Sequence, residues 1–396
     1  MLRDHPKQRP WWSWTLAAIA VLALAHLAGG PAHASTITVA PGAADINAGD
    51  GLCSLGEAVA NANDDAATHA DCAAGNGADT IELGASSDYE FTTGTASALV
   101  ISDELIINGN AATVRQTGSA NRRLITNLSG TILVLRHLTL QDGYTFENGG
   151  AIANSGDLTV TNVTFDGNSA LMNGGAIFLS ASSPGAALRV QNATFTGNAA
   201  IGTGSGGAIY ASGSNFSFLV RDSTFDDNRA LNGGAIYLSQ SPATGLIAYS
   251  TFTGNRAYSN GGAIYLSSSL SNAMRLDHLT LTGNQADSAG GGLYLSVSAE
   301  IASSDLSLNT AGTSGGGIAT SSALTLTQVS LRDNSAAVNG AGLNVILVST
   351  SPRVIRYSEI SGNSAGNNGG GMAVIEGGAV NLSHSTISGN DAANDG

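Results

Sequence analysis

The feature that most constrains the fold is an internal repeat of 25–32 residues that fills most of the chain after residue 149. A glycine-rich signature, in most copies a glycine pair followed by a small residue and an aliphatic one, occurs nine times. Its copies start at Gly149, Gly174, Gly206, Gly233, Gly261, Gly290, Gly315, Gly340 and Gly369. Because glycine pairs in every unit would destabilise helical repeats, this signature favours a solenoid of short strands.

A second signature alternates with the first and consists of an apolar residue, an Asn three positions later, and an Ala two positions beyond that Asn. Its apolar residues are Phe165, Phe195, Phe225, Phe252, Leu281, Leu306, Leu331, Ile360 and Ile387. Between the signatures, apolar residues recur with the period of two that is typical of strands. The pattern predicts an all-β, right-handed parallel β-helix, a solenoid with two or three strands per coil.

Stacked coils place equivalent residues above one another, about 4.8 Å apart. We therefore expect the apolar column to form an internal stack. The Asn column, Asn168 to Asn390, is expected to adopt left-handed backbone at a corner and to bond from coil to coil as an amide ladder. The Ala column, Ala170 to Ala392, indicates a corner too crowded for larger side chains.

The first 34 residues have the character of an export signal. Basic residues at the start (Arg3, Lys7, Arg9) precede an apolar stretch over residues 16–27, and Ala32-His33-Ala34 is a small-x-small cleavage pattern. The apolar stretch is shorter than the roughly 20 residues of a membrane span, so cleavage near Ala34 is favoured over an uncleaved anchor. We therefore expect a secreted, extracellular or outer-membrane-surface protein.

Removal of residues 1–34 leaves 15 − 3 = 12 basic and 29 − 1 = 28 acidic residues, a net charge of 12 − 28 = −16. A surface of this charge repels nucleic acid and anionic membranes, which we exclude as partners. Membrane attachment would then require a segment outside this sequence. The last residues, 391–396, stop where another glycine pair is expected, so we expect a chain that continues or a partner that covers the last coil.

Residues 35–98 are predicted to form an amino-terminal cap, and residues 99–396 the β-helix itself. Ser54 and Glu57 have capping-box spacing and predict a short helix that ends at about Asn63. Cys53 and Cys72 flank this helix, and in an exported chain such a pair predicts a disulfide, with metal binding as the alternative. No metal site is expected otherwise, although Asp45, Asn47 and Asp50 have a faint calcium-loop spacing in which Gly49 replaces a ligand.

The motif from Cys53 to Val59, Cys-Ser-Leu-Gly-Glu-Ala-Val, resembles the CSLREA domain at the start of exported bacterial β-helix proteins. Gly56 stands where that motif has Arg, so no role of that Arg transfers to this chain. The glycine-pair and Phe-x-x-Asn repeats resemble those of polymorphic outer membrane proteins, a family of β-helical surface adhesins. The resemblance implies this fold and export, but proteins of this fold include adhesins, surface proteins and pectin-lyase-like polysaccharide enzymes.

Carboxylates that could cleave a glycan gather in one repeat. Asp222, Asp226 and Asp227 are the best catalytic candidates, with Arg221, Arg229 and Arg256 nearby in sequence. The alternative is that these acids flank turns and are simply solvated. The histidines His137, His278 and His384 share one column with other polar residues, which we interpret as an outward polar position.

An aromatic row is the strongest candidate binding surface. The residue after the aliphatic position of the glycine signature should point outward, and in five consecutive repeats it is Phe178, Tyr210, Tyr237, Tyr265 and Tyr294. Such a row could stack on sugar rings or anchor a protein, or it could only stabilise the sheet.

These observations predict a secreted or surface-displayed β-helix without catalytic activity that adheres to a polysaccharide, a cell-surface glycan or a protein. The alternative is a pectin-lyase-like polysaccharide lyase or hydrolase, which would need acids and a base converging in one groove. No cofactor is expected, and calcium is the only ion that the pattern leaves open.

Overall fold

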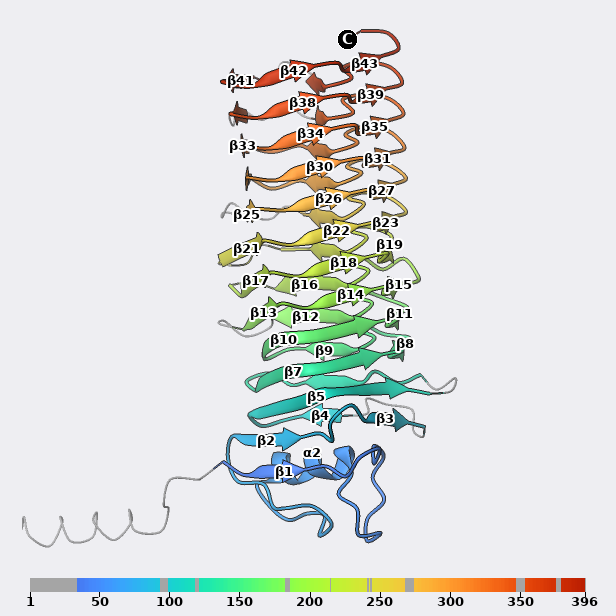
Figure 1. The fold of residues 1–396 in the computed structure, drawn as a ribbon, viewed down its shortest axis with the longest axis vertical. Coiled ribbons are helices and arrows are strands. Elements are labelled where there is room, and N and C mark those ends of the chain that lie inside the picture. Colours follow the sequence, from blue (N-terminus) through green and yellow to red (C-terminus); the bar gives the residue numbers. More distant parts are fainter. Residues whose placement is uncertain are drawn as a thin grey trace, which may run out of the picture.

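The computed structural model describes residues 34–92, 99–117, 121–181, 186–213, 215–240, 242, 244–267, 274–346, 353–374 and 379–395. They form a right-handed parallel β-helix of about ten turns, as predicted, with a small cap at its amino-terminal end (Figure 1). The predicted signal peptide lies almost wholly outside the described residues and stays a prediction. Within the described ranges, no helix is long and apolar enough to cross a membrane.

Sheet A is the widest of three parallel sheets and has two columns of strands, joined by the long strands of the first turns. The first column contains β1 (Thr36–Thr38), β2 (Asp79–Glu82), β5 (Leu105–Gln116), β7 (Ile132–Gln141), β10 (Asp157–Asp166), β13 (Ala187–Gln191), β17 (Ser217–Arg221), β21 (Thr244–Ala248), β25 (Met274–Asp277), β29 (Ala299–Ala302), β33 (Leu324–Thr327), β37 (Arg353–Arg356) and β41 (Val380–Ser383). The second column adds β3 (Asp88–Phe91), β14 (Thr194–Thr196), β18 (Thr224–Asp226), β22 (Thr251–Thr253), β26 (Thr280–Thr282), β30 (Asp305–Ser307), β34 (Ser330–Arg332), β38 (Glu359–Ser361) and β42 (Thr386–Ser388).

Sheet B forms a second wall and carries the aliphatic residues of the glycine signature. Its strands are β4 (Leu99–Ile101), β6 (Ile125–Asn127), β9 (Ile152–Asn154), β12 (Ile177–Ala181), β16 (Ile209–Gly213), β20 (Ile236–Leu238), β24 (Ile264–Leu266), β28 (Leu293–Leu295), β32 (Ile318–Thr320), β36 (Leu343–Val345) and β40 (Met372–Val374).

Sheet C is a narrow third wall of two-residue strands at the corner marked by the Ala column. Its strands are β8 (Tyr144–Thr145), β11 (Ser169–Ala170), β15 (Ala199–Ala200), β19 (Arg229–Ala230), β23 (Arg256–Ala257), β27 (Gln285–Ala286), β31 (Thr310–Ala311), β35 (Ser335–Ala336), β39 (Ser364–Ala365) and β43 (Asp391–Ala392). The alanines of β11 to β39 are at most 3% exposed, which confirms the crowded corner.

The core between the sheets is one continuous cluster of stacked apolar residues, as the repeat predicted. Phe165, Phe195, Phe225 and Phe252 stack with ring centroids 4.6–4.7 Å apart and ring planes within 1–3° of parallel. The column continues through buried leucines and Ile360, and it reaches the surface at Ile387, which is 44% exposed.

A buried amide ladder runs beside the phenylalanine stack, which confirms that prediction. Asn228 is fully buried, and its Oδ1 accepts hydrogen bonds from both the backbone N and the Nδ2 of Asn198 at 3.0 Å. Its own Nδ2 donates to Asn255 Oδ1 at 3.0 Å and to the Phe195 carbonyl at 2.9 Å. Each Asn therefore ties together the coil below it, its own coil and the coil above it.

The predicted left-handed backbone at the Asn position is wrong by one residue. The residue before each Asn has the positive φ, 51–65°, and it is usually Gly, as at Gly197 and Gly254. The Asn itself must point inward to reach the amides above and below, so the preceding outward residue makes the turn. In two coils this residue is an aspartate, Asp227 or Asp333, and in one it is Leu308.

The two glycines of each signature serve different purposes. Gly233 has a φ of +59°, which favours glycine, whereas a Cβ on Gly234 would lie 2.1 Å from the carbonyl oxygen of Gly262 in the next coil. Most second positions have the same close approach of backbone to backbone, although Ala341 occupies one of them. The pair is thus explained by coil stacking rather than by a ligand.

The cap consists of β1 and helix α2 (Leu55–Asp64), which lie below the first coils in Figure 1. The predicted capping box is present: the Ser54 hydroxyl accepts from Glu57 N, and Glu57 Oε2 accepts from Ser54 N. The buried face of α2 includes Leu55, Ala58 and Val59. Gly56 is buried against Ile46, whose Cγ1 would be 2.7 Å from a Cβ at that position, so an Arg there would require the Ile46 side chain to move.

Replacement of Asn228 by Ala should leave two buried donors of Asn198 unsatisfied, and we expect a loss of about 3 kcal/mol in the free energy of unfolding. The measurement is urea unfolding followed by circular dichroism. Asn390→Ala is the matched control, because Asn390 makes the same bonds but is only half-buried, so water can replace them. Equal losses in the two variants would contradict a buried ladder.

Candidate functional site

The aromatic row lies on the outer face of sheet B, where the sequence placed it. Phe178, Tyr210, Tyr237, Tyr265 and Tyr294 are register partners on β12, β16, β20, β24 and β28. Their strand neighbours, such as Ile236 and Leu238, point inward and are fully buried. The five aromatic side chains are half-buried rather than freely exposed. We call these five residues the aromatic column.

The rings of the aromatic column stack on one another along the axis of the solenoid. Adjacent ring centroids are 4.7–5.4 Å apart and the interplanar angles are 5–22°. This arrangement follows from the coil spacing, which is close to the distance at which rings stack. Because neighbours cover most ring faces, a ligand on this face meets ring edges and phenol groups. The flat, face-exposed platform that the sequence suggested is therefore not the geometry observed.

Two phenols of the aromatic column, those of Tyr237 and Tyr265, have raised pKa values. Burial raises the pKa values of Tyr237 and Tyr265, and hydrogen bonds from nearby serines only partly oppose this shift. Ser267 bonds both hydroxyls, and Ser296 also bonds Tyr265. Tyr237 and Tyr265 thus present hydrogen-bonded, uncharged hydroxyl groups at the centre of the column.

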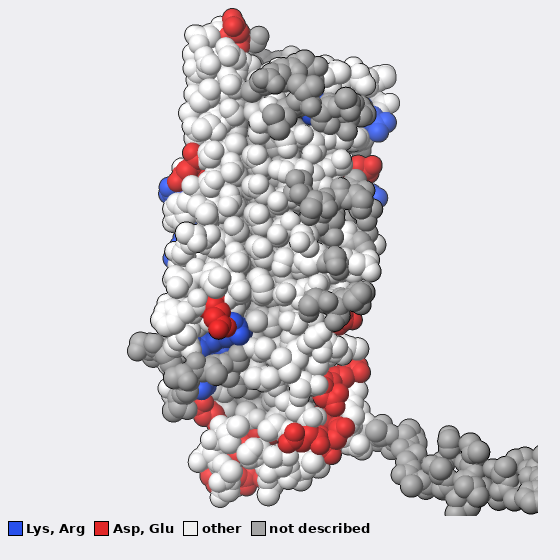
Figure 2. Space-filling model, turned by 180° about the vertical axis from the view of Figure 1, so that it is seen from behind, with Lys and Arg blue, Asp and Glu red and all other residues white. Residues whose placement is uncertain are grey.

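The outer face of sheet B carries no charged side chain along this column. Beyond Tyr294 the column continues with Ala319 and Asn344, both buried. Figure 2 shows the molecule from behind, with a broad uncharged surface along the solenoid and acidic residues gathered at the capped end. An acidic protein of net charge −14 therefore keeps one long face neutral.

The three candidate catalytic aspartates occupy turns and a strand surface. Asp222 and Asp227 both have φ of +51°, and Asp226 lies between them on β18. Asp222 pairs with Arg221, with Oδ2 and Nε 3.2 Å apart. Partial burial, with a contribution from Asp227, raises the pKa of Asp226.

The arginines predicted to assist these acids lie mostly on another wall. Arg229 and Arg256 are register partners on sheet C, and Arg256 pairs with Asp287 at 3.2 Å. Neither the cavity between Gly369 and Asn390 nor the groove beside His278 includes Asp222, Asp226 or Asp227 in its lining. The role of these aspartates stays a prediction, and their geometry favours solvated turn positions.

A polar groove that the sequence did not single out lies on the outer surface of sheet A. Its volume is about 520 Å³, and its lining includes His278, Thr280, Ser303, Asp305, Gln328 and Ser330. His278 Nδ1 lies 2.9 Å from Asp277 Oδ1, and Arg275 holds the other oxygen of Asp277 at 3.0 Å. The carboxylate thereby orients the imidazole and leaves Nε2 available as a base.

Aromatic stacking also fixes the imidazole in this groove. The ring of His278 stacks on Tyr249 at 4.5 Å, and the guanidinium of Arg221 covers the Tyr249 ring at 5.2 Å. His278 belongs to a column of residues with positive φ that also includes His137 and His384. In sequence this column looks like a plain outward position, and only the neighbouring Asp277 distinguishes His278 from its equivalents.

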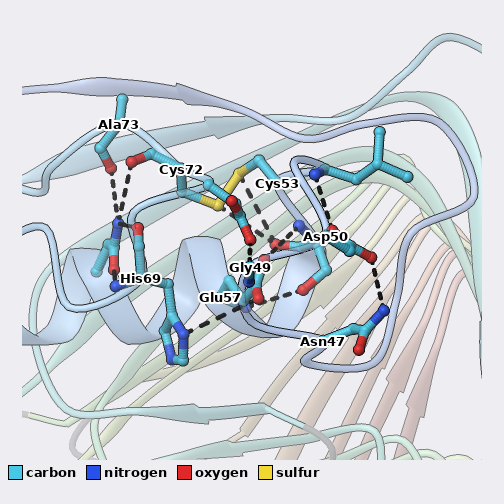
Figure 3. Close-up of polar contacts among 12 residues, drawn as sticks. Asn47, Gly49, Asp50, Cys53, Glu57, His69, Cys72 and Ala73 are labelled. Carbon is cyan, nitrogen blue, oxygen red and sulfur yellow. Dashed lines mark hydrogen bonds and ion pairs between the residues drawn. A yellow bond between two sulfur atoms is a disulfide. The ribbon is translucent and has the colours of Figure 1, made fainter.

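The predicted disulfide between Cys53 and Cys72 is present in the cap (Figure 3). Asn61 of α2 strengthens the same loop, because its Nδ2 donates to the carbonyls of His69 and Ala73 at 2.9 and 3.0 Å. The buried Glu57 caps the helix with one oxygen, and its other oxygen lies 3.9 Å from His69 Nδ1. The cap is thus held by one covalent bond and a buried polar network.

The residues with calcium-loop spacing bond to protein groups. Asn47 Nδ2 donates to Asp50 Oδ2 at 2.7 Å (Figure 3). Asp45 accepts from Thr92 and pairs with Arg122 at 3.1 Å. Although partial burial opposes ionisation, these bonds lower the pKa of Asp45. Within the described part of the chain, no group of three or more His, Cys, Asp or Glu residues is arranged to hold a metal ion.

Residues 151–335 match the family model described as the right handed beta helix region. The match spans the coils that carry the aromatic column and all of the groove lining. No curated protein and no solved structure matches the chain. The chain therefore contains a right-handed β-helix region, and its function must be argued from its own surfaces.

Replacement of both cysteines of the cap by Ser should destabilise the protein by about 3 kcal/mol, because the disulfide closes a loop of 19 residues. The measurement is thermal unfolding with and without a reductant. The wild-type protein in reductant should then unfold like the variant. Unchanged unfolding after either treatment would mean that the cap does not limit stability.

Proposed function

We propose that this protein is a secreted or surface-displayed β-helix that binds a polysaccharide or a cell-surface glycan along the outer face of sheet B. The observation that carries the proposal is the aromatic column, a continuous row of four phenols and one phenyl ring on an uncharged face. Ring edges contribute apolar contact area, and the phenol groups can exchange hydrogen bonds with sugar hydroxyls.

The rigidity of the aromatic column supports this proposal. Binding usually costs the ordering of side chains at the interface, about 0.5–1.5 kcal/mol for each rotamer-rich side chain. In this column the rings already stack and the Tyr237 and Tyr265 hydroxyls are already hydrogen-bonded, so little ordering remains. The column spans five coils, or about 19 Å, which suits an extended ligand lying along the solenoid axis.

The sequence features that predict export support the same proposal. The resemblance of its repeats to those of surface adhesins, its export-like amino terminus and its disulfide are all compatible with a protein that meets glycans outside the cell. A neutral binding face also suits a glycan, because an acidic face would repel charged polysaccharides.

The groove on sheet A supports a second candidate, a polysaccharide hydrolase or lyase. A base oriented by a carboxylate is a component of many active sites, and the Asp277–His278 pair supplies one. Asp305 lies in the same groove and bonds Arg332, with Oδ1 and Nε 3.3 Å apart. This candidate ranks second because His278 and Asp305 are both open to solvent at a shallow surface.

Conversion of Tyr210, Tyr237, Tyr265 and Tyr294 to Phe should weaken glycan binding at least tenfold. This variant keeps the ring stack but removes the hydroxyl groups that would bond a sugar. The measurement is a glycan array followed by titration of the best ligand, with the thermal midpoint as a check of folding.

A matched control for this variant is Thr164→Val with Thr194→Val, which removes two outward hydroxyls from sheet A instead. Its binding should equal that of the wild type. Undiminished binding by the four-fold Phe variant would remove the aromatic column from the proposal. A wild-type protein that binds no glycan on the array would refute the proposal as a whole.

A digestion panel of polysaccharides, with and without calcium, separates the two candidates. We expect no new reducing ends and no unsaturated products from the wild type. If any substrate is cleaved, His278→Ala should abolish the cleavage, whereas His384→Ala should not. His384 is the matched control because it has the same positive φ and a similar aromatic stack, on Tyr357 at 5.0 Å, but follows Ser383 rather than an acid.

A further inference from the structure

An exposed apolar ridge follows the first half of sheet C. Its residues directly follow the last residues of β8, β11, β15, β19 and β23, and they are Phe146, Leu171, Ile201, Leu231 and Tyr258. Four of them are 42–55% exposed, and Leu231 is half-buried. Met172, beside Leu171, is also 50% exposed. These strands form the lower part of the right-hand edge in Figure 1.

The ridge is confined to five consecutive coils. In the coils that follow, the equivalent positions are Asp287, Gly312, Ala337, Gly366 and Ala393. The change is abrupt, although the backbone and the buried alanines of sheet C continue unchanged. Fold stability therefore does not require large apolar side chains at this position, and a contiguous exposed apolar strip about 19 Å long is typical of an interaction surface.

The order of the side chains along the ridge is palindromic. It reads Phe, Leu, Ile, Leu, Tyr, so that an aromatic residue stands at each end, a leucine at each next position and Ile201 at the centre. A two-fold axis through Ile201 and perpendicular to the solenoid would place Phe146 of one copy on Tyr258 of the other. Leu171 would meet Leu231, and Ile201 would meet itself. Such self-complementarity is what an isologous interface requires.

The charges at the two ends of the ridge fit the same arrangement. At one end Glu147, whose side chain is 75% exposed, pairs with Arg123 at 3.0 Å. At the other end the guanidinium of Arg256 lies over the Tyr258 ring at 5.1 Å and pairs with Asp287. An antiparallel pair places the coil of Glu147 in one copy opposite the coil of Arg256 in the other, whereas a parallel pair places each of these coils opposite its own equivalent. The ion pairs would also form the polar rim that surrounds an apolar interface.

We propose that the ridge is the interface of an antiparallel, two-fold homodimer of this protein. The proposal stands apart from glycan binding, because the ridge borders sheet C and the aromatic column lies on the face of sheet B. Both columns of the dimer stay open, and two linked sites would bind a multivalent surface more tightly than one.

Light scattering coupled to size-exclusion chromatography tests the dimer. The wild type should have twice the monomer mass. Ile201→Glu should be monomeric or at least tenfold weaker in association, because two new carboxylates would meet at the axis. Val338→Glu is the matched control, since Val338 is an exposed apolar residue of the same turn three coils beyond the ridge, and this variant should stay dimeric. A monomeric wild type would refute the proposal.

Cysteine cross-linking tests the antiparallel orientation, because the described chain has no free cysteine. Ile201→Cys should cross-link with itself. Phe146→Cys and Tyr258→Cys should each fail to cross-link alone but should cross-link when the two variants are mixed. Efficient cross-linking of Phe146→Cys with itself would indicate a parallel pair and would overturn the proposed geometry. Ile201→Cys that stays uncross-linked in a dimeric protein would place the interface elsewhere.

Discussion

The structure depends on the hydrogen bonding of each coil to the next, and the buried Asn ladder is its most demanding part. From Asn198 to Asn363, each ladder Asn accepts two bonds from the coil below and donates to the coil above, as Asn228 does between Asn198 and Asn255. Because these amides are fully buried, each must find its partner at the same height and in the same orientation. The ladder therefore sets the register of every coil, and the phenylalanine stack beside it follows that register.

Because the register is fixed, equivalent residues of successive coils line up as columns on the surface of the solenoid. The aromatic column is the clearest case, because its rings stack on one another with almost the spacing of the coils. The same stacking hides most of the ring faces, so the chemistry of the surface is that of ring edges and hydroxyls. The proposed glycan binding and a stabilising role are thus compatible at this site, because the stack that stabilises sheet B also pre-orders the phenols.

The outer surfaces of the three sheets differ from one another in charge and polarity. Sheet B is neutral and aromatic, sheet A carries the Asp277–His278 groove, and the edge of sheet C carries the apolar ridge. The repeat leaves these outward positions free to vary, because only the inward positions and the turns are constrained by stacking. A change of residue type within an outward column therefore says more about function than the repeat itself. The change from Tyr258 to Asp287 at the end of the ridge is an example.

The sequence by itself determined the fold class, the apolar stack, the amide ladder, the capping box and the disulfide, because each depends on local spacing or on a residue type repeated at one offset. Tertiary structure alone decided which residue makes each left-handed turn, that the aromatic faces are covered, and that Asp277 orients His278. It also placed Arg353 inside the core between Leu324 and Val380, where alternation of apolar residues would not put an arginine. The register of Ile355 with the aliphatic column forces Arg353, two residues earlier, to point inward as well. Such outcomes depend on what lies one coil above or below, about 25–32 residues away in sequence.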